Sequence, residues 1–346
     1  MDALSEILLD FAIKEGACVA GIATIETLAG APPSADLTYV LPEAKSAVAF
    51  AVPLDQTLIL PYLTKQDRLS VERDVIHVNS RASGISLEMA SYLQMRGFAA
   101  APVLANMRYR PDAPSGIWDM YPDLSHRYLA ARSGVGYLGL SGNLITPSHG
   151  AAVILGSVVT AADLTPTDPL PPEQKYCDGC GLCMASCASR FIDLHQKVSV
   201  TLGGVEFEYS QRRDYNRCGY VCGGFAGLHS SGKWSTWSPG RFPIPADDGE
   251  FLPALQKAMK RYREWLPIEG GFYSPMMKGT VRMACGHCQL ICASDREERE
   301  RRYRALTGSG VVIQKADGSL EAVSPEAAVQ ALASMPAETR RLYEEL

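Results

Sequence analysis

The chain has 346 residues and a formal net charge of -5 at pH 7; 47% of its residues are hydrophobic and 21% are charged. These proportions are those of an ordinary folded protein with a sizeable core, and the length suits two domains with appendages. The acidic balance gives no general attraction to nucleic acid or to an acidic membrane surface. No apolar run is long enough to span a bilayer. Neither nucleic acid nor a membrane is therefore an expected partner.

The N-terminus shows none of the usual export signals. Residues 1–7 contain no positively charged segment, no twin arginine and no apolar h-region. Nine of the ten cysteines lie between residues 177 and 292. Thiols that serve as metal ligands suit a reducing compartment better than an oxidising one. A cytoplasmic location is therefore expected.

Helical and strand patterns alternate through the first hundred residues. Apolar residues recur at helical spacing over 3–15 and 66–96. Strands are predicted over 19–23, 46–52 and 98–104. The run at 46–52 is apolar throughout, as expected of a strand that is covered on both faces. This alternation predicts an α/β fold in which helices pack on a sheet.

A polar, proline-rich loop over 111–123 breaks the alternation, and its length favours a role at a functional site. A helix over 124–132 follows, with Asp123 or Ser125 as its N-cap. The next stretch, 133–147, has four glycines in ten residues, which lets the backbone approach another group closely. It matches G-x-G-x-x-G, but a helix precedes the match where a nucleotide site needs a strand. Nucleotide binding is therefore not favoured.

A proline-rich linker over 166–172 follows an apolar strand over 151–160, and we place a domain boundary in it. The patterns after the linker differ from those before it, because cysteine motifs and a long insertion interrupt them. They predict, in chain order, a strand pair over 198–209, an amphipathic helix over 251–265, a charged helix from 295, a hairpin over 311–323 and two short helices after 325.

Cysteine spacing is the most informative feature of the sequence. From Cys177 to Cys187 the chain reads C-x2-C-x2-C-x3-C, the spacing with which bacterial ferredoxins hold four-iron clusters. In those proteins the fourth thiolate binds the neighbouring cluster, so two clusters are implied. A second motif runs from Cys285 to Cys292 but has one thiolate fewer, because Arg282 stands at the matching position. Two clusters need eight thiolates, and the two motifs supply seven.

The eighth thiolate is expected from the cysteines between the motifs. Only Cys218 and Cys222 lie there, and we assign Cys218, with Cys222 as its substitute. The predicted ligands are Cys177, Cys180, Cys183 and Cys292 for the first cluster, and Cys187, Cys218, Cys285 and Cys288 for the second. A zinc site or disulfides are the alternatives, but neither explains the uninterrupted four-cysteine run.

The order of these motifs resembles that of the cobalamin-dependent reductases with two [4Fe-4S] clusters. A helix that ends in Ala-Ala-Arg132 is followed by Ser-Gly-Val-Gly-Tyr-Leu-Gly139, Leu-Ile-Thr-Pro147, an apolar strand and the two cysteine motifs. The family contains the epoxyqueuosine reductases and the reductive dehalogenases. The resemblance covers roughly residues 1–295.

The resemblance implies the domains, the cofactor contacts and the catalytic group. The implied domains are a nitroreductase-like α/β (α+β) domain over 1–168 that binds base-off cobalamin, a ferredoxin-like two-cluster domain over 169–300 with an insertion at 223–284, and a C-terminal hairpin and helices over 301–346. The implied corrin contacts are Gly134, Gly136, Gly139, Asn143, Leu144, Ile145 and Thr146. The family's proton donor matches a position near Met120, which makes Asp119, Tyr121, Asp123 and His126 the candidates.

Departures from the family pattern shape the expected function. Ala188 and Ala293 replace the prolines that usually follow each motif, which removes no ligand. About fifty residues follow Cys292, too few for the helical-repeat domain with which epoxyqueuosine reductase binds tRNA. We therefore expect reduction of a small-molecule substrate, with electrons from an external donor such as ferredoxin or flavodoxin. The alternatives are an electron carrier or reductive activator of a partner corrinoid protein, and an epoxyqueuosine reductase-like tRNA modification.

Overall fold

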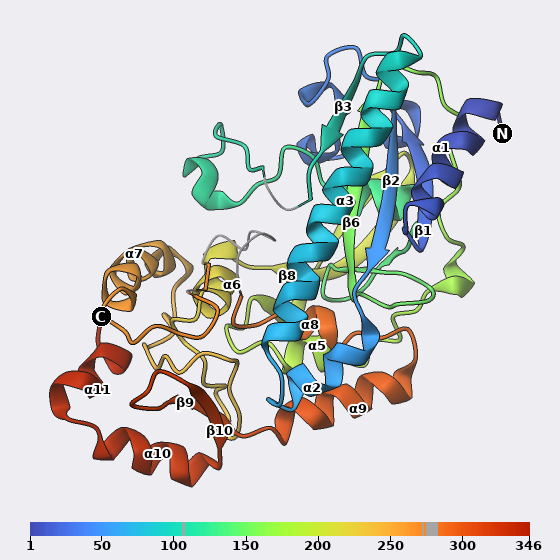
Figure 1. The fold of residues 1–346 in the computed structure, drawn as a ribbon. Helices are drawn as coiled ribbons and strands as arrows, with labels where there is room; N and C mark the ends of the chain where they lie inside the picture. Colours follow the sequence, from blue (N-terminus) through green and yellow to red (C-terminus); the bar gives the residue numbers. More distant parts are fainter. Residues whose placement is uncertain (106–107, 272, 275–282) are drawn as a thin grey trace.

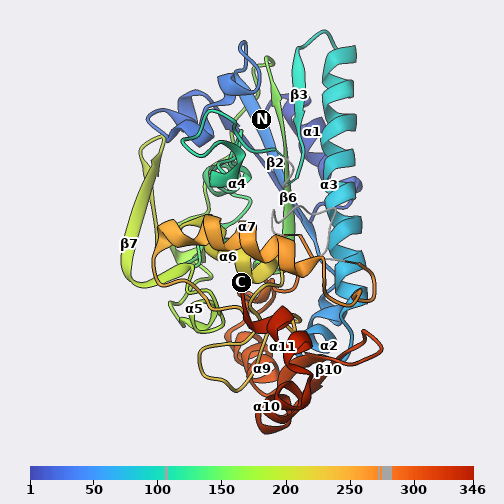
Figure 2. The same ribbon diagram turned by 90° about the vertical axis from the view of Figure 1, so that its left-hand side faces the viewer.

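The computed structural model describes residues 1–105, 108–271, 273–274 and 283–346, and Figures 1 and 2 show it from two directions at right angles. Helices and strands are mixed along the chain, which confirms the predicted α/β (α+β) class. Arg282 and part of the predicted insertion lie outside the described residues. No helix in the described ranges combines the length and the apolarity that crossing a bilayer requires.

A four-stranded antiparallel sheet forms the centre of the N-terminal part. Its strands stand in the order β1 (Val19–Thr24), β2 (Ser46–Pro53), β6 (Val153–Thr160) and β3 (Ala100–Val103). β2 pairs with β6 along its whole length, from Ser46 opposite Thr160 to Pro53 opposite Val153. The residues of β2 before Pro53 are all buried, as predicted for a strand with both faces covered.

Helices cover both faces of this sheet (Figure 2). Side chains of β2 point alternately to the two faces. Val48 and Phe50 join the core shared with α1 (Ala3–Lys14) and α3 (Leu69–Met95). The alternating alanines of β2, at positions 47, 49 and 51, join the core beneath α4 (His126–Arg132) on the opposite face. The larger side chains of β2 thus contact the long helices, and the smaller ones let α4 approach closely.

Capping residues explain where two of these helices end or begin. α3 stops before Gly97, whose φ of 85° is the left-handed conformation predicted for its C-terminal glycine. At the start of α4 the cap is Ser125, because its Oγ accepts a hydrogen bond from the backbone nitrogen of Tyr128 at 3.4 Å. Asp123, the alternative cap, forms an ion pair with Arg108 at 3.2 Å.

Short elements build the cysteine region and the C-terminal part. They are α2 (Ile59–Leu63), β4 (Tyr137–Leu138), β5 (Leu144–Ile145), α5 (Leu182–Ala185), β7 (Ile192–Leu202), β8 (Val205–Arg212), α6 (Tyr215–Cys222), α7 (Phe251–Tyr262), α8 (His287–Leu290), α9 (Arg296–Thr307), β9 (Val311–Gln314), β10 (Leu320–Val323), α10 (Pro325–Ser334) and α11 (Ala337–Glu344). The two predicted hairpins are β7–β8 and β9–β10. α3 runs from α2, beside the cysteine region, to the far end of the sheet (Figure 1), so one helix connects both parts of the molecule.

A candidate iron-sulfur and cofactor site

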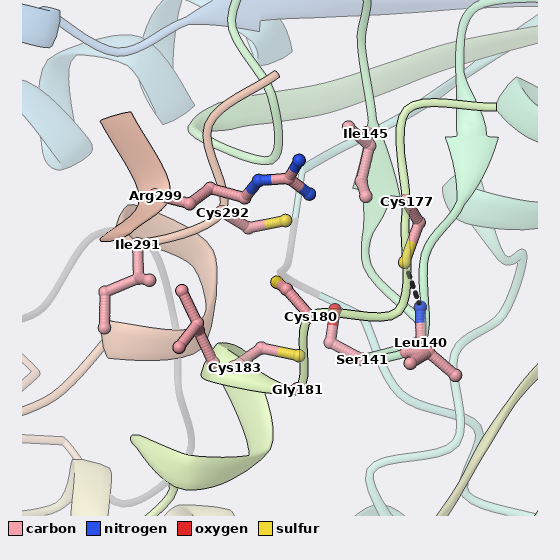
Figure 3. Close-up of a pocket in the computed structure, with 11 residues that line it drawn as sticks. Leu140, Ser141, Ile145, Cys177, Cys180, Gly181, Cys183, Ile291, Cys292 and Arg299 are labelled. Atoms are coloured by element: carbon pink, nitrogen blue, oxygen red, sulfur yellow. Dashed lines mark hydrogen bonds between the residues drawn. The ribbon is translucent and has the colours of Figure 1, made fainter. Parts of the chain in front are cut away.

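Four cysteines from two distant segments line one small pocket (Figure 3). Cys177, Cys180 and Cys183 come from the first motif, and Cys292 is the last cysteine of the second. Their sulfur atoms point toward a common centre. These four residues are the set predicted for the first cluster, and we call them the first thiol group.

Two glycines and one arginine of α9 hold the loop of the first motif. Gly179 and Gly181 have φ angles of 76° and 72°, a conformation that favours glycine. Asp178 accepts a hydrogen bond from the backbone nitrogen of Cys180 at 3.1 Å and pairs with Arg299 at 3.2 Å. The side chain of Arg299 is only 4% exposed and lines the same pocket. A positive charge is therefore buried beside the four sulfurs.

The glycine-rich segment and the residues that follow it, up to Ala151, position two of the four cysteines. The backbone nitrogen of Ala151 donates a hydrogen bond to the carbonyl oxygen of Cys292 at 2.7 Å. A side chain on Gly150, which has a φ of 60°, would collide with that carbonyl. The backbone nitrogen of Leu140 donates to Cys177 Sγ at 3.4 Å (Figure 3). This segment therefore packs directly against the cysteine motifs.

Burial and crowding oppose ionisation of two cysteines of the first thiol group, Cys183 and Cys292. Burial, followed by the charges of Cys177 and Cys180, raises the pKa of Cys183 to about 12. Burial, followed by Cys183 and Cys177, also raises the pKa of Cys292 to about 12. Thiolates packed this closely need a positively charged partner, and metal binding supplies one by displacing the protons. The donor set, four thiols around one pocket, fits a four-iron cluster.

The remaining five cysteines of the region gather in a second thiol group. Cys218 and Cys222 lie one turn apart on α6, with their sulfur atoms 3.7 Å apart. Hydrogen bonds with Cys218 and Cys285 raise the pKa of Cys222. Burial raises the pKa of Cys187 and of Cys288, and in both cases Cys218 is the next cause. The structure thus brings both alternatives for the eighth ligand beside the other three.

The arrangement of the cysteines also bears on the two alternative interpretations of the motifs, which are disulfides and a zinc site. All ten cysteines are free thiols. A zinc ion binds sulfur at about 2.3 Å and therefore needs its ligands in close tetrahedral contact. Within the part of the chain that the structure describes, no group of three or more His, Cys, Asp or Glu side chains is arranged to hold a single metal ion.

A larger cavity opens between the second thiol group and the sheet. Its volume is about 280 Å³, close to the lower end of the roughly 300–1000 Å³ of most small-molecule pockets, and it opens to solvent. Its polar lining comprises Asn79, Tyr109, Ser125, His126, Arg127, Asn143, Arg212, Tyr215 and Gln289.

Only part of the predicted corrin-binding segment reaches this cavity. Asn143 and Leu144 line it. Ile145, the next residue of β5, lines the pocket of the first thiol group instead. Thr146 is fully buried, and its hydroxyl donates to the carbonyl oxygen of Gly150 at 3.0 Å. The segment therefore divides its side chains between the two sites.

The three predicted glycine contacts face the chain itself. A side chain on Gly134 would collide with the backbone of Asp168, and a side chain on Gly136 or Gly139 would collide with Ile145. None of the three glycines is among the described residues that line the large cavity. The glycines allow close packing of this segment against its own neighbours.

One of the four predicted catalytic residues, His126, is among the described residues that line the cavity. Its Nδ1 lies 2.8 Å from the hydroxyl of Ser157, and its Nε2 lies 3.4 Å from the carbonyl oxygen of Leu104. Burial lowers the pKa of His126 to about 4. The imidazole is therefore neutral at pH 7 and has no readily released proton to give to a substrate.

The other three predicted catalytic residues make local contacts. Asp119 accepts a hydrogen bond from the backbone nitrogen of Ser115 at 2.8 Å. Asp123 is held by Arg108, as described above. The carbonyl oxygen of Tyr121 accepts from the backbone nitrogen of Arg110 at 2.8 Å. None of the three is among the described residues that line the cavity.

Sequence reasoning missed a polar group on the cavity wall. Arg127 and Arg212 each donate a hydrogen bond to the hydroxyl of Tyr215 at 3.2 Å. Burial raises the pKa of Tyr215, but the charges of Arg127 and Arg212 outweigh it and lower the pKa to about 8. Arg127 and Tyr215 are 88 residues apart, and no spacing rule connects them.

Comparison with known proteins places the chain among its relatives. No family model matches it. It is 37% identical over 82 residues to an epoxyqueuosine reductase from Synechococcus sp. (strain RCC307), a match that covers 23% of this chain and 25% of that protein. The chain is thus similar to epoxyqueuosine reductases over part of its length. A second such protein, from Gloeobacter violaceus, is 26% identical over 158 residues, which is 45% of this chain and 44% of that protein.

This relationship to the epoxyqueuosine reductases confirms the resemblance seen in the motifs, although each match spans less than half of the relative. Solved structures give lower identities. A crystal structure of epoxyqueuosine reductase with a modified tRNA stem loop is 15% identical, with a TM-score of 0.45 over 98% of this chain and 74% of that one. A catabolic reductive dehalogenase in complex with 3-bromo-4-hydroxybenzoic acid is 14% identical, with a TM-score of 0.48 over 97% and 37%.

Proposed function

We propose that the chain is an oxidoreductase that uses two [4Fe-4S] clusters and base-off cobalamin to reduce a small-molecule substrate in the cytoplasm. One observation carries the proposal: Cys292 meets Cys177, Cys180 and Cys183 at one pocket, although it follows Cys183 by more than a hundred residues. Cluster chemistry predicts this meeting, since the last cysteine of each motif belongs to the other motif's cluster. The partial relationship to epoxyqueuosine reductases supports the same chemistry.

The ligand sets follow from the two thiol groups. In this proposal the first cluster binds the first thiol group. The second cluster binds Cys187, Cys285 and Cys288 together with Cys218, for which Cys222 is the alternative. An external donor such as ferredoxin or flavodoxin supplies the electrons. The pocket of the first thiol group is lined by Cys180 and Cys177, which are both partly exposed, so we assign electron entry to that side.

The large cavity is the proposed place for cobalamin and substrate. Bound cobalamin supplies a cobalt centre that takes up single electrons and reduces a bond of the substrate. The chain's own part is to keep that centre close to the second cluster. The side-chain amide of Asn143 lines the cavity and lies 3.8 Å from Cys288 Sγ. Gln289, the residue after Cys288, lines the cavity too, and its side chain donates to the carbonyl oxygen of Val153 at 2.8 Å.

The metal content of anaerobically prepared, cobalamin-supplied protein tests the proposal. We expect about eight irons and one cobalt per chain, with cluster and cobalt signals in the EPR spectrum. Replacing Cys292 by serine should remove about half of the iron, because it disrupts one cluster of two. Iron without cobalt would favour the rival function, an electron carrier or reductive activator of a partner corrinoid protein. Zinc or no metal would overturn both.

Modification of tRNA is a second candidate, favoured by the names of the sequence relatives. It requires the chain to bind the anticodon stem loop of a tRNA. The net charge of -5 provides no general attraction to RNA. A binding assay with epoxyqueuosine-containing tRNA at several salt concentrations distinguishes the candidates. Specific binding that weakens as salt increases would support tRNA modification and overturn the small-molecule assignment.

A further inference from the structure

Two arginines on the wall of the large cavity have only neutral hydrogen-bond partners in the part of the chain that the structure describes. Arg127 donates to the carbonyl oxygen of Gly142 and to the hydroxyl of Tyr215. Arg212 donates to the carbonyl oxygen of Ser141 at 2.9 Å, and also to the hydroxyl of Tyr215. Arg212 donates a third hydrogen bond to the side-chain oxygen of Asn143 at 2.6 Å. These oxygens orient the two guanidinium groups but cancel neither charge.

Two half-buried positive charges that share one phenol are unfavourable without a counter-charge. Burial, followed by the charge of Arg212, lowers the pKa of Arg127. After burial, the strongest electrostatic influences on Arg127 are Arg212, which opposes its charge, and three tyrosines, which favour it. The charge of Arg127 therefore remains for something else to balance.

We propose that Arg127, Arg212 and Tyr215 form a binding site for an oxyanion, and that the occupant is the carboxylate of a small, largely apolar substrate. Guanidinium groups bind carboxylates through paired N–H donors, and the tyrosine hydroxyl offers a third donor. The same cavity is lined by apolar side chains, among them Leu144 and Leu155, which suit the apolar body of such a molecule.

The assignment of this anion to a substrate rests on the proposed function. The same oxyanion chemistry occurs in the phosphate of the nucleotide tail of cobalamin, which is the other source of a ligand for these arginines. The carboxylate would belong to the substrate and the phosphate to cobalamin, but both anions would bind through the positive charge of Arg127. The experiment therefore measures the anion site first, and its source second.

The first measurement is calorimetric titration of the anaerobic, cluster-loaded protein, without cobalamin, with benzoate and with inorganic phosphate. We expect saturable binding of one anion per chain. Arg127→Gln should weaken it at least about tenfold, and Arg127→Lys should weaken it less, because lysine keeps the charge but loses the paired donors. Iron content and circular dichroism check the fold of both variants. The matched control is Arg213→Gln, which removes an arginine that pairs with Asp193 at 2.8 Å and should leave the affinity unchanged.

The second measurement compares cobalamin with cobinamide, a corrinoid without the nucleotide tail and its phosphate. If Arg127→Gln weakens benzoate binding and leaves both corrinoids unaffected, the substrate assignment holds. If the variant weakens cobalamin but not cobinamide, the anion is the cofactor's phosphate and the substrate assignment is overturned. Wild-type protein that binds neither benzoate nor phosphate, or equal affinities in wild type and Arg127→Gln, would overturn the site itself. A chain that binds no corrinoid overturns the proposed function alone, since the anion titrations do not use cobalamin.

Discussion

The side-chain nitrogen of Asn143 lies 3.8 Å from Cys288 Sγ, and Asn143 also lines the large cavity. One amide thus contacts a proposed cluster ligand on one side and the proposed cofactor site on the other. Arg212 fixes its orientation by donating to its oxygen at 2.6 Å. The NH2 group is therefore the part turned toward the sulfur, where it is a hydrogen-bond donor.

Replacing Asn143 by leucine should lower the reduction potential of the second cluster. A hydrogen bond to a ligand sulfur stabilises the reduced, more negative state of a cluster, so its loss disfavours reduction. An EPR-monitored redox titration measures the shift, and the iron content should stay at the wild-type value. Leu144→Met is the control, because it changes the cavity wall next to Asn143 without offering or removing a hydrogen bond. An unchanged potential in Asn143→Leu would contradict the prediction.

The eighth cluster ligand can be identified by comparing two serine variants. Cys218 is a cause of the raised pKa of both Cys187 and Cys288, whereas Cys222 exchanges hydrogen bonds with Cys218 and Cys285. We therefore expect Cys218→Ser to lose about four of eight irons and Cys222→Ser to keep them all. Iron per chain and EPR spin counts measure the difference. The opposite result would make Cys222 the ligand and Cys218 its spare neighbour.

The ion pair between Arg299 and Asp178 should stabilise the loop of the first thiol group. The side chain of Arg299 is 4% exposed, and that of Asp178 is 33% exposed. Arg299→Gln should lower the free energy of unfolding by about 2 kcal/mol, because it removes the buried partner of Asp178 and leaves only the exposed pair with Arg296 at 3.3 Å. It should also speed the loss of iron to a chelator. Chemical unfolding and chelation kinetics measure the two effects.

The same helix provides the control for this variant. Arg301 is 58% exposed and pairs with Glu298 on α9 itself. Exposed pairs of this kind contribute less than about 1 kcal/mol, so Arg301→Gln should change neither stability nor iron retention by much. Equal effects of the two substitutions would show that the charge of α9 matters and the contact with Asp178 does not.

The sequence predicted the elements that depend on local pattern, and it predicted that the two cysteine motifs approach each other. The apolar run at 46–52 is the buried strand β2. The count of thiolates predicted that Cys292 approaches Cys177, which local pattern alone could not do. The glycines were less informative. A glycine in the sequence indicates that another group can approach the backbone closely, but it does not indicate which group. At Gly134 that group is the backbone of Asp168.

Pairs of side chains that the tertiary fold brings together could not be predicted. Arg127 occupies an ordinary position in the predicted helix over 124–132, and Tyr215 lies in a segment with no recognised pattern. Only the packing of α4 against the cysteine region places them 3.2 Å apart. The same limit applies to His126, whose spacing in the sequence does not show that it faces a cavity beside Ser157.

His126 should make the stability of the chain depend on pH. Its pKa in the folded chain is about 4 because of burial, and the ordinary value is about 6.5. Between these values the unfolded chain binds a proton that the folded chain does not, so the free energy of unfolding falls as the pH decreases from about 6.5 to 4. From pH 7 to pH 5 this one group should remove about 2 kcal/mol.

Urea unfolding of wild type and His126→Gln at pH 7 and pH 5 tests this linkage. The variant cannot take up the proton, so its stability should fall by about 2 kcal/mol less than that of the wild type over the same interval. His195, an exposed residue of β7, provides the control: His195→Gln should keep the wild-type dependence on pH. If His126→Gln and wild type lose stability equally, protonation of this cavity histidine is not coupled to unfolding. Its contacts with Ser157 and Leu104 would then serve to position the start of α4.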